Sequence, residues 1–130
     1  MSPPLNRILY IEDDPDIQSI AVTALEGLGG WAVKACDSGE QALCEAPGFA
    51  PDLILLDVMM QGLDGPATLR ALRRDPGLAG VPAVFLTARV QPHETTQYLA
   101  LGAIDVIPKP FDPMKLAGIL RTIWERHHAP

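Results

Sequence analysis

The stretch Leu53-Ile-Leu-Leu-Asp57-Val-Met-Met-Gln-Gly-Leu-Asp-Gly65 decides the fold class. Its four leading apolar residues are too few for a helix and too uniformly apolar for a strand with one solvent-facing side. They therefore predict a strand that is buried on both faces of a parallel sheet. Similar short runs recur along the chain, at Ile8–Ile11, Trp31–Val33, Ala83–Leu86 and Ile104–Ile107.

Helical patterns separate these apolar runs. The clearest covers Pro15 to Leu28, where apolar residues recur every three or four positions, with Asp14 as the N-cap and Gly29-Gly30 as the stop. A second clear stripe runs from Leu116 to Trp124, behind Asp112 and Pro113. Weaker patterns predict helices over 64–74, 38–45 and 93–101, and we expect the last of these to be the most mobile or the most exposed.

Five strands that alternate with helices imply right-handed βαβ units, hence a parallel sheet with helices on both faces. The predicted fold class is a doubly wound, five-stranded α/β domain. A length of 130 residues fits a single domain, 1–130, with a core of about 7–126. The composition, with 48% hydrophobic and 20% charged residues, is that of a globular protein.

Charge and composition exclude several classes of function. The net charge is −6, no basic stripe is present and aromatic residues make up 5% of the chain, so we expect no direct nucleic-acid binding. The longest stretch without a charged residue, 76–88, contains Pro and Gly, so we expect no membrane insertion. No secretory pattern opens the chain, which favours a cytoplasmic location. Cys36 and Cys44 are both expected to be small core residues.

Polar residues gather at the carboxyl ends of four predicted strands, which is where open α/β sheets bind ligands. These residues are Glu12, Asp13 and Asp14 after the first strand, Asp57 at the third, Thr87 with Ala88 at the fourth, and Lys109 at the fifth. Carboxylates that converge on one edge repel each other unless a cation intervenes. Because all the ligands are oxygens, the pattern predicts a hard ion such as Mg²⁺, and with it a phosphate group.

Three residues supply chemistry around such a phosphate. Lys109 and Thr87 offer donors for phosphoryl oxygens. Asp57 offers a nucleophile for a phosphorus centre, and its product would be an aspartyl phosphate.

Four fragments resemble, in order and spacing, the receiver domain of two-component response regulators. They are Ile-Glu-Asp-Asp after the first strand, Leu-Leu-Asp57-Val-Met-Met-Gln-Gly-Leu-Asp-Gly, Leu-Thr87-Ala88 and Lys109-Pro110-Phe111. The resemblance extends from about Arg7 to Trp124. It implies a flavodoxin-like receiver fold with strand order 2-1-3-4-5 and five helices.

The resemblance also implies a phosphorylation site. Asp57 matches the phosphoacceptor, which takes phosphorus from the phosphohistidine of a sensor histidine kinase or a histidine phosphotransfer protein. Asp13 matches the direct Mg²⁺ ligand, Glu12 the neighbour that reaches the ion through water, and the Met59 carbonyl the remaining protein ligand. The phosphorylated form is expected to bind a downstream protein partner through the face around the fourth and fifth helices.

The remaining matches concern switching and access. Thr87 matches the switch hydroxyl, Lys109 the phosphoryl-contacting lysine, and Lys109-Pro110 a peptide that is usually cis. Ala88 matches a small residue that gives the phosphoryl group access to Asp57. Two positions depart from the family: Val106 replaces the switch aromatic, and Gln61 replaces a proline, a change that we expect to loosen its loop.

Two other functions compete with a phosphoacceptor receiver. A phosphohydrolase with an aspartyl nucleophile usually carries a second Asp two residues further on, where this chain has Met59. A pseudo-receiver that only docks is compatible with Val106.

We expect no enzyme activity beyond self-catalysed phosphoryl acceptance and autodephosphorylation, and we expect Arg89 and Met59 to tune the rate of hydrolysis. The sequence leaves open the cognate kinase, phosphorylation-dependent dimerisation and whether the natural chain is longer.

Overall fold

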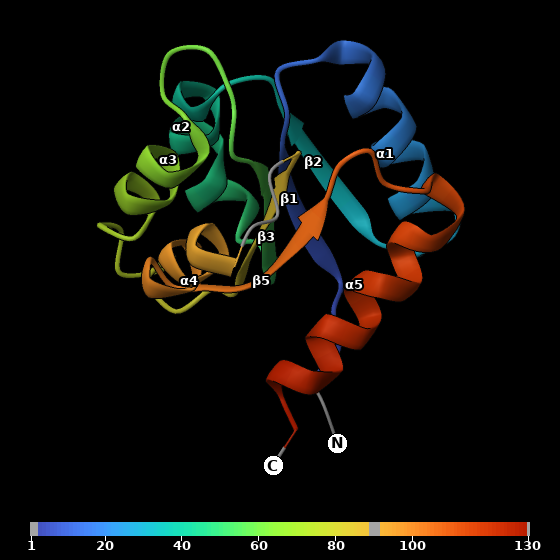
Figure 1. Ribbon diagram of the computed structural model, residues 1–130. Coiled ribbons are helices and arrows are strands. Elements are labelled where there is room, and N and C mark those ends of the chain that lie inside the picture. The colour runs from blue at the N-terminus through green and yellow to red at the C-terminus, as the bar shows by residue number, and fades with distance from the viewer. Residues whose placement is uncertain (1–2, 89–91, 130) are drawn as a thin grey trace.

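Five parallel strands form one sheet in the computed structural model, which describes residues 3–88 and 92–129 (Figure 1). The order β2-β1-β3-β4-β5 confirms the predicted doubly wound topology. The strands are β1 (Arg7–Ile11), β2 (Ala32–Cys36), β3 (Leu53–Asp57), β4 (Ala83–Thr87) and β5 (Ala103–Pro108).

Helices cover both faces of this sheet (Figure 1). On one face α1 and α5 pack over a core that includes Tyr10 and Leu25. On the other face α2, α3 and α4 lie over a second core that includes Phe85 and Leu69. The helices are α1 (Pro15–Gly27), α2 (Gly39–Phe49), α3 (Gly65–Leu72), α4 (Pro92–Ala100) and α5 (Pro113–His127). None of the described helices is both long and apolar enough to cross a membrane.

The burial of the strands depends on their place in the sheet. Every residue of the central strands β3 and β4 is buried, as the apolar runs predicted. The edge strands β2 and β5 are only partly buried, and they carry Lys34 and Asp105 in their middles. The expectation that all five strands are fully buried was therefore wrong for β2 and β5, because each has a strand neighbour on one side only.

Side-chain caps start the helices where the sequence predicted them. The Asp14 carboxylate accepts hydrogen bonds from the backbone N–H groups of Asp16 (2.9 Å) and Ile17 (3.2 Å) at the start of α1. The Asp112 carboxylate accepts one from the N–H of Met114 (2.9 Å) at the start of α5. A proline follows each cap at the first helical position, where its missing N–H costs nothing.

Helix α2 runs four residues beyond its predicted end at Glu45. Ala42 and Ala46 are both fully buried against the sheet, and the extra turn places Phe49 beneath the Arg7 guanidinium, 5.0 Å from the ring centroid. Pro47 lies in this last turn, where it removes only one intrahelical hydrogen bond. Packing of Ala46 against the sheet and of Phe49 against Arg7 therefore extends the helix beyond the end that the local sequence predicted.

The two cysteines have different environments, which corrects one prediction. Cys36 is buried at the end of β2, where burial raises the pKa of its thiol to about 12. Cys44 is exposed, because it lies on the side of α2 opposite the buried Ala42 and Ala46. The expected exposure of α4 is confirmed, since none of its residues with a described side chain is buried.

The αL position at the end of α2 gives a stability prediction. Ala50 has φ = 53°, a conformation that costs a non-glycine residue about 1–2 kcal/mol. Ala50→Gly removes this strain but makes the unfolded chain more flexible, so we expect the free energy of unfolding to rise by about 0.5–1 kcal/mol. Urea denaturation measures this change.

Gly30 provides the matched control, because it has φ = 72° and no atom lies within 4 Å of the position that a Cβ would take. Gly30→Ala should lower the free energy of unfolding by a similar amount, about 0.5–1 kcal/mol. An Ala50→Gly variant that is less stable than the wild type would contradict the assignment.

Candidate functional site

Three polar side chains are buried at the carboxyl ends of adjacent strands. Glu12 follows β1 and is 1% exposed, Asp57 ends β3 and is 4% exposed, and Thr87 ends β4 and is 1% exposed. Because β1, β3 and β4 are neighbours in the sheet, their carboxyl ends meet at one edge. The topology thus brings together residues that are far apart in the sequence.

The carboxylates of Glu12, Asp13 and Asp57 form one cluster. Each offers an oxygen atom, and these atoms all lie within 4.8 Å of one another, with Asp13 the most exposed of the three. In residues 3–88 and 92–129 no other group of three or more His, Cys, Asp or Glu side chains is placed to hold a metal ion. An all-oxygen ligand set of this kind fits a hard divalent cation.

Lys109 joins the cluster from the end of β5. Its Nζ atom lies 2.9 Å from an oxygen of Glu12 and 3.1 Å from an oxygen of Asp57. The predicted convergence of Asp13, Asp57 and Lys109 on a common site is confirmed in the geometry. The ammonium group partly neutralises two carboxylates that would otherwise repel each other.

Burial and charge shift the proton affinities at this site. Burial raises the pKa of Glu12 to about 7, the hydrogen bond from Lys109 opposes the rise, and the charge of Asp57 adds to it. Burial alone would lower the pKa of Lys109, but the hydrogen bonds to Glu12 and Asp57 outweigh it, so the pKa lies above its usual value. At neutral pH the site therefore pairs a fully charged lysine with a glutamate that is close to its own titration point.

The Lys109–Pro110 peptide is cis, as the resemblance implied. The Lys109 N–H donates a hydrogen bond to the Thr87 carbonyl (2.9 Å). The backbone that carries the lysine is thereby joined to the strand that carries the threonine.

Gln18 holds the acidic loop after β1, a role that the sequence did not reveal. Its side-chain amide donates hydrogen bonds to the carbonyls of Glu12 (3.0 Å) and Cys36 (3.1 Å). The Glu12 carboxylate also accepts the N–H of Asp14 (3.2 Å). The sequence indicates only that a polar residue lies on the inner side of α1. It does not indicate which loop the side chain of that residue binds.

The backbone of Gln61 contacts the acidic loop after β1, while the expectation that this residue loosens its own loop stays a prediction. Its backbone N–H donates a hydrogen bond to the Asp13 carboxylate (3.2 Å). A proline at this position has no N–H and could not make the bond. The replacement therefore ties the loop after β3 to the acidic loop after β1.

Gly65 allows α3 to begin directly beside the phosphoacceptor candidate. A Cβ atom at this position would collide with the Asp57 carbonyl, and the Gly65 N–H donates a hydrogen bond to the Val58 carbonyl (3.0 Å). Any larger residue would push the helix away from the end of β3.

The other predicted site residues lie around this centre. Met59 is 67% exposed, two residues after Asp57, and Ala88 is exposed after β4. Pro110 is exposed, and Val106 is half-buried on β5. Arg89 lies outside the described residues, so its predicted role in hydrolysis stays a prediction.

The sequence of the chain matches a known family over most of its length. A family model described as the response regulator receiver domain matches residues 8–121. The chain belongs to this family. As a receiver domain, it is a phosphoacceptor module of two-component signalling.

Relatives and solved structures support the same assignment. The receiver is 36% identical to the DNA-binding response regulator MtrA of Mycolicibacterium smegmatis, over 93% of this chain and 51% of the relative. It is 39% identical to the transcriptional regulatory protein CpxR of Escherichia coli K12, over 95% and 51% respectively. The chain thus spans about half the length of the curated relatives it matches.

The fold agrees with solved receivers. The chemotaxis response regulator CheY4 of Vibrio cholerae superposes with a TM-score of 0.85 at 26% identity, covering 92% of this chain and 99% of that one. The N-terminal domain of a response regulator receiver protein from Methanoculleus marisnigri JR1 has a TM-score of 0.74 at 34% identity, covering 98% and 99%.

The raised pKa of Glu12 predicts a pH dependence of stability in metal-free buffer. Between about pH 4.5 and 7 the folded state holds a proton that the unfolded state has released. The contribution of Glu12 to stability is therefore fully present below pH 4.5 and is lost as the pH rises through about 7. Glu12→Gln should become more stable relative to the wild type as the pH increases over this range, as measured by urea denaturation in EDTA.

The control is Glu26→Gln, which changes an exposed glutamate on α1. The stability difference between this variant and the wild type should stay flat over the same pH range. If the stability difference between Glu12→Gln and the wild type is also independent of pH, the environment of Glu12 does not disfavour its charged form.

Proposed function

We propose that Asp57 accepts a phosphoryl group from the phosphohistidine of a sensor histidine kinase or a histidine phosphotransfer protein. The observation that carries this proposal is the contact between Lys109 and Asp57, at 3.1 Å, beside the cluster of three carboxylates. A buried aspartate with a cationic donor next to it can act as a nucleophile and hold a charged product.

Mg²⁺ is the cofactor that this proposal assigns to the cluster. Asp13 and Asp57 would bind it directly, Glu12 through water, and the carbonyl of Met59 would complete the protein ligands. The fit rests on the three oxygen donors within 4.8 Å of one another and on the absence of nitrogen or sulfur from the set. Bound there, the ion would neutralise charge on the carboxylates and on the phosphoryl oxygens.

The residues of this chain would divide the transfer step among them. A carboxylate oxygen of Asp57 attacks phosphorus in line, and the bond from phosphorus to the histidine nitrogen breaks. The phosphohistidine ring carries a proton on its other nitrogen, so the histidine leaves as the neutral imidazole. Lys109 and the Thr87 hydroxyl donate to the phosphoryl oxygens, so charge that spreads in a loose transition state is stabilised. Hydrolysis later returns Asp57 and inorganic phosphate.

We propose that this receiver is not an enzyme for external substrates. A phosphohydrolase needs an acid to protonate the leaving group, and the position two residues after Asp57 holds Met59, which cannot supply a proton. A docking-only pseudo-receiver is disfavoured, because Glu12, Asp13 and Lys109 all accompany Asp57. Steady release of phosphate from a generic aryl phosphate would contradict this view.

The output is proposed to be phosphorylation-dependent binding of a downstream protein around α4 and α5. Lys109 directly follows β5, which both helices contact, so we expect a change at the lysine to reach that face. MtrA is named as DNA-binding, but the net charge of −6 supports a protein partner for this domain and no direct nucleic-acid contact. We place the reaction in the cytoplasm, with the transcriptional regulator CpxR as the supporting relative.

Phosphorylation itself is directly testable. Incubation with acetyl phosphate and Mg²⁺ should add one phosphoryl group, which intact-mass spectrometry detects, and EDTA should prevent the addition. Asp57→Asn should abolish it, because an amide oxygen is a poor nucleophile and cannot form the acyl phosphate.

Asp52→Asn is the matched control for this experiment. The Asp52 carboxylate accepts the N–H groups of Asn6 (3.0 Å) and Arg7 (2.9 Å) ahead of β1, at the opposite edge of the sheet. This variant should be phosphorylated like the wild type. A phosphoryl group that persists in Asp57→Asn would refute the assignment.

Met59 is predicted to tune the loss of the phosphoryl group. Its exposed side chain belongs to the residue two positions after Asp57, and we expect it to limit the approach of water. Met59→Ala should speed autodephosphorylation by up to about tenfold, which corresponds to about 1.4 kcal/mol in the barrier. Phosphate release after removal of the donor gives the rate, and an unchanged rate would count against this role.

A further inference from the structure

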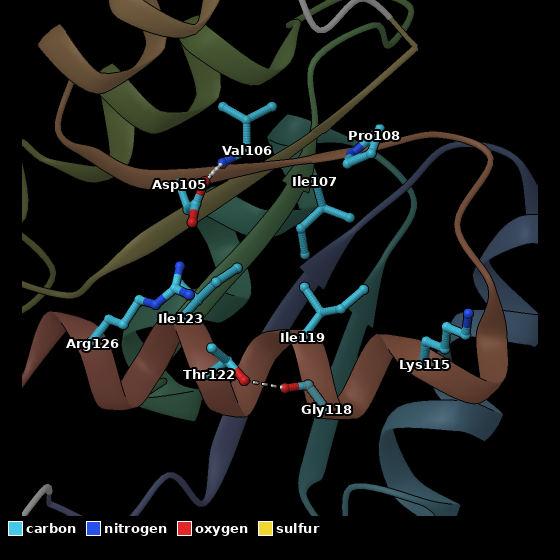
Figure 2. Close-up of a pocket in the computed structure, with 10 residues that line it drawn as sticks. All are labelled: Asp105, Val106, Ile107, Pro108, Lys115, Gly118, Ile119, Thr122, Ile123 and Arg126. Carbon is cyan, nitrogen blue, oxygen red and sulfur yellow. Dashed lines mark hydrogen bonds between the residues drawn. The ribbon is translucent and has the colours of Figure 1, made fainter.

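Position 106 holds no side chain able to act as an aromatic switch. Val106 lies on β5 directly beside Phe85 of β4 in the strand register. Figure 2 shows its side chain pointing away from α5, whereas the neighbouring Ile107 points toward that helix. Val106 therefore belongs to the face that α2, α3 and α4 cover, and its side chain is smaller than an aromatic ring.

An aromatic ring does lie on this face, but it comes from a helix. The ring of Tyr98 on α4 is 5.2 Å from the ring of Phe85, centroid to centroid, with the planes tilted by 52°. Tyr98 and Val106 both pack against the same core cluster and are both half-buried. A half-buried ring at the margin of a core can move further in or out at lower cost than a fully buried one.

A short path along β4 leads from the phosphorylation site to this ring. Thr87 and Phe85 are two residues apart on β4, so their side chains lie on the same face of the sheet. Phe85 in turn contacts Tyr98. Phe85 therefore lies between Thr87 and Tyr98, on the route by which a displacement of Thr87 could reach the Tyr98 ring.

We propose that Tyr98 on α4 is the aromatic reporter of the phosphorylated state, taking the part that Val106 cannot play. This inference rests on the proposed function of Asp57. When the Thr87 hydroxyl turns to donate to a phosphoryl oxygen on Asp57, the packing beside Phe85 changes. The Tyr98 ring repacks in response and shifts α4, so that the helix surface differs between the two states.

The chain offers a sharp test, because it contains two tyrosines. Tyr10 lies in the core on the opposite face of the sheet, near Glu12 and Asp57, and Tyr98 lies on α4. The full chain labelled with 3-fluorotyrosine should give two ¹⁹F NMR signals, which Tyr10→Phe assigns. Mg²⁺ alone serves as the baseline, and Mg²⁺ with beryllofluoride mimics the phosphoryl group.

We expect beryllofluoride to shift the Tyr98 signal in the wild type and in Thr87→Ser, which keeps the hydroxyl. The Tyr98 signal should stay at its baseline in Thr87→Val, which has nearly the same shape without the hydroxyl, and in Thr87→Ala as a second variant. A purely structural role of Tyr98 predicts no such dependence on the hydroxyl. The Tyr10 signal reports independently that the site is occupied.

The outcomes separate the inference from the proposed function. A Tyr98 signal that stays fixed while the Tyr10 signal moves, or while mass spectrometry shows phosphorylation, overturns the role of Tyr98 and leaves the phosphoacceptor intact. A Tyr98 shift of equal size in Thr87→Val and Thr87→Ala overturns the route through Thr87. Failure of acetyl phosphate to add any phosphoryl group overturns both proposals.

Discussion

The arrangement of this receiver depends on the burial of negative charge at one edge of the sheet. Glu12 and Asp57 are almost entirely removed from solvent, and moving a carboxylate out of water is costly unless it is paired. Lys109 supplies the pairing by contacting both groups. The compensation is incomplete, since burial still raises the pKa of Glu12 to about 7. The folded protein therefore retains an electrostatic strain that a bound divalent cation would relieve.

The loops at this edge hold the charges in place through specific hydrogen bonds. Gln18 binds the carbonyl of Glu12, and the N–H of Gln61 binds the Asp13 carboxylate. Gly65 lets α3 approach the end of β3 closely enough to position Asp57. These contacts join segments from three strands, so the three carboxylates keep their mutual distances although they come from separate segments. Buried like charges raise the free energy of the folded state. The hydrogen bonds around the site offset this cost and keep the carboxylates in place.

The face that carries α4 differs in character from the site. The described side chains of α4 include none that is fully buried, and Tyr98 provides its aromatic contact with the core through Phe85. An element with little buried surface changes position at low cost, which suits it to reading out a small movement at the end of β4. Val106 places only a small side chain on this face of β5, and a ring on the adjacent helix contacts the same core. The ring that packs against Phe85 on this face thus comes from α4 and not from β5.

The sequence by itself determined the order of elements, the helix caps at Asp14 and Asp112, and the placement of polar residues at the strand ends. These features are local, since apolar periodicity and capping depend on neighbours within a few residues. Tertiary structure decided the partial exposure of β2 and β5, the length of α2 and the exposure of Cys44. It also decided the hydrogen bonds of Gln18 and Gln61, and the contact of Tyr98 with Phe85. Each of these features depends on contacts between segments that are far apart in the sequence. The spacing of residues along the chain does not indicate which distant segments will be in contact.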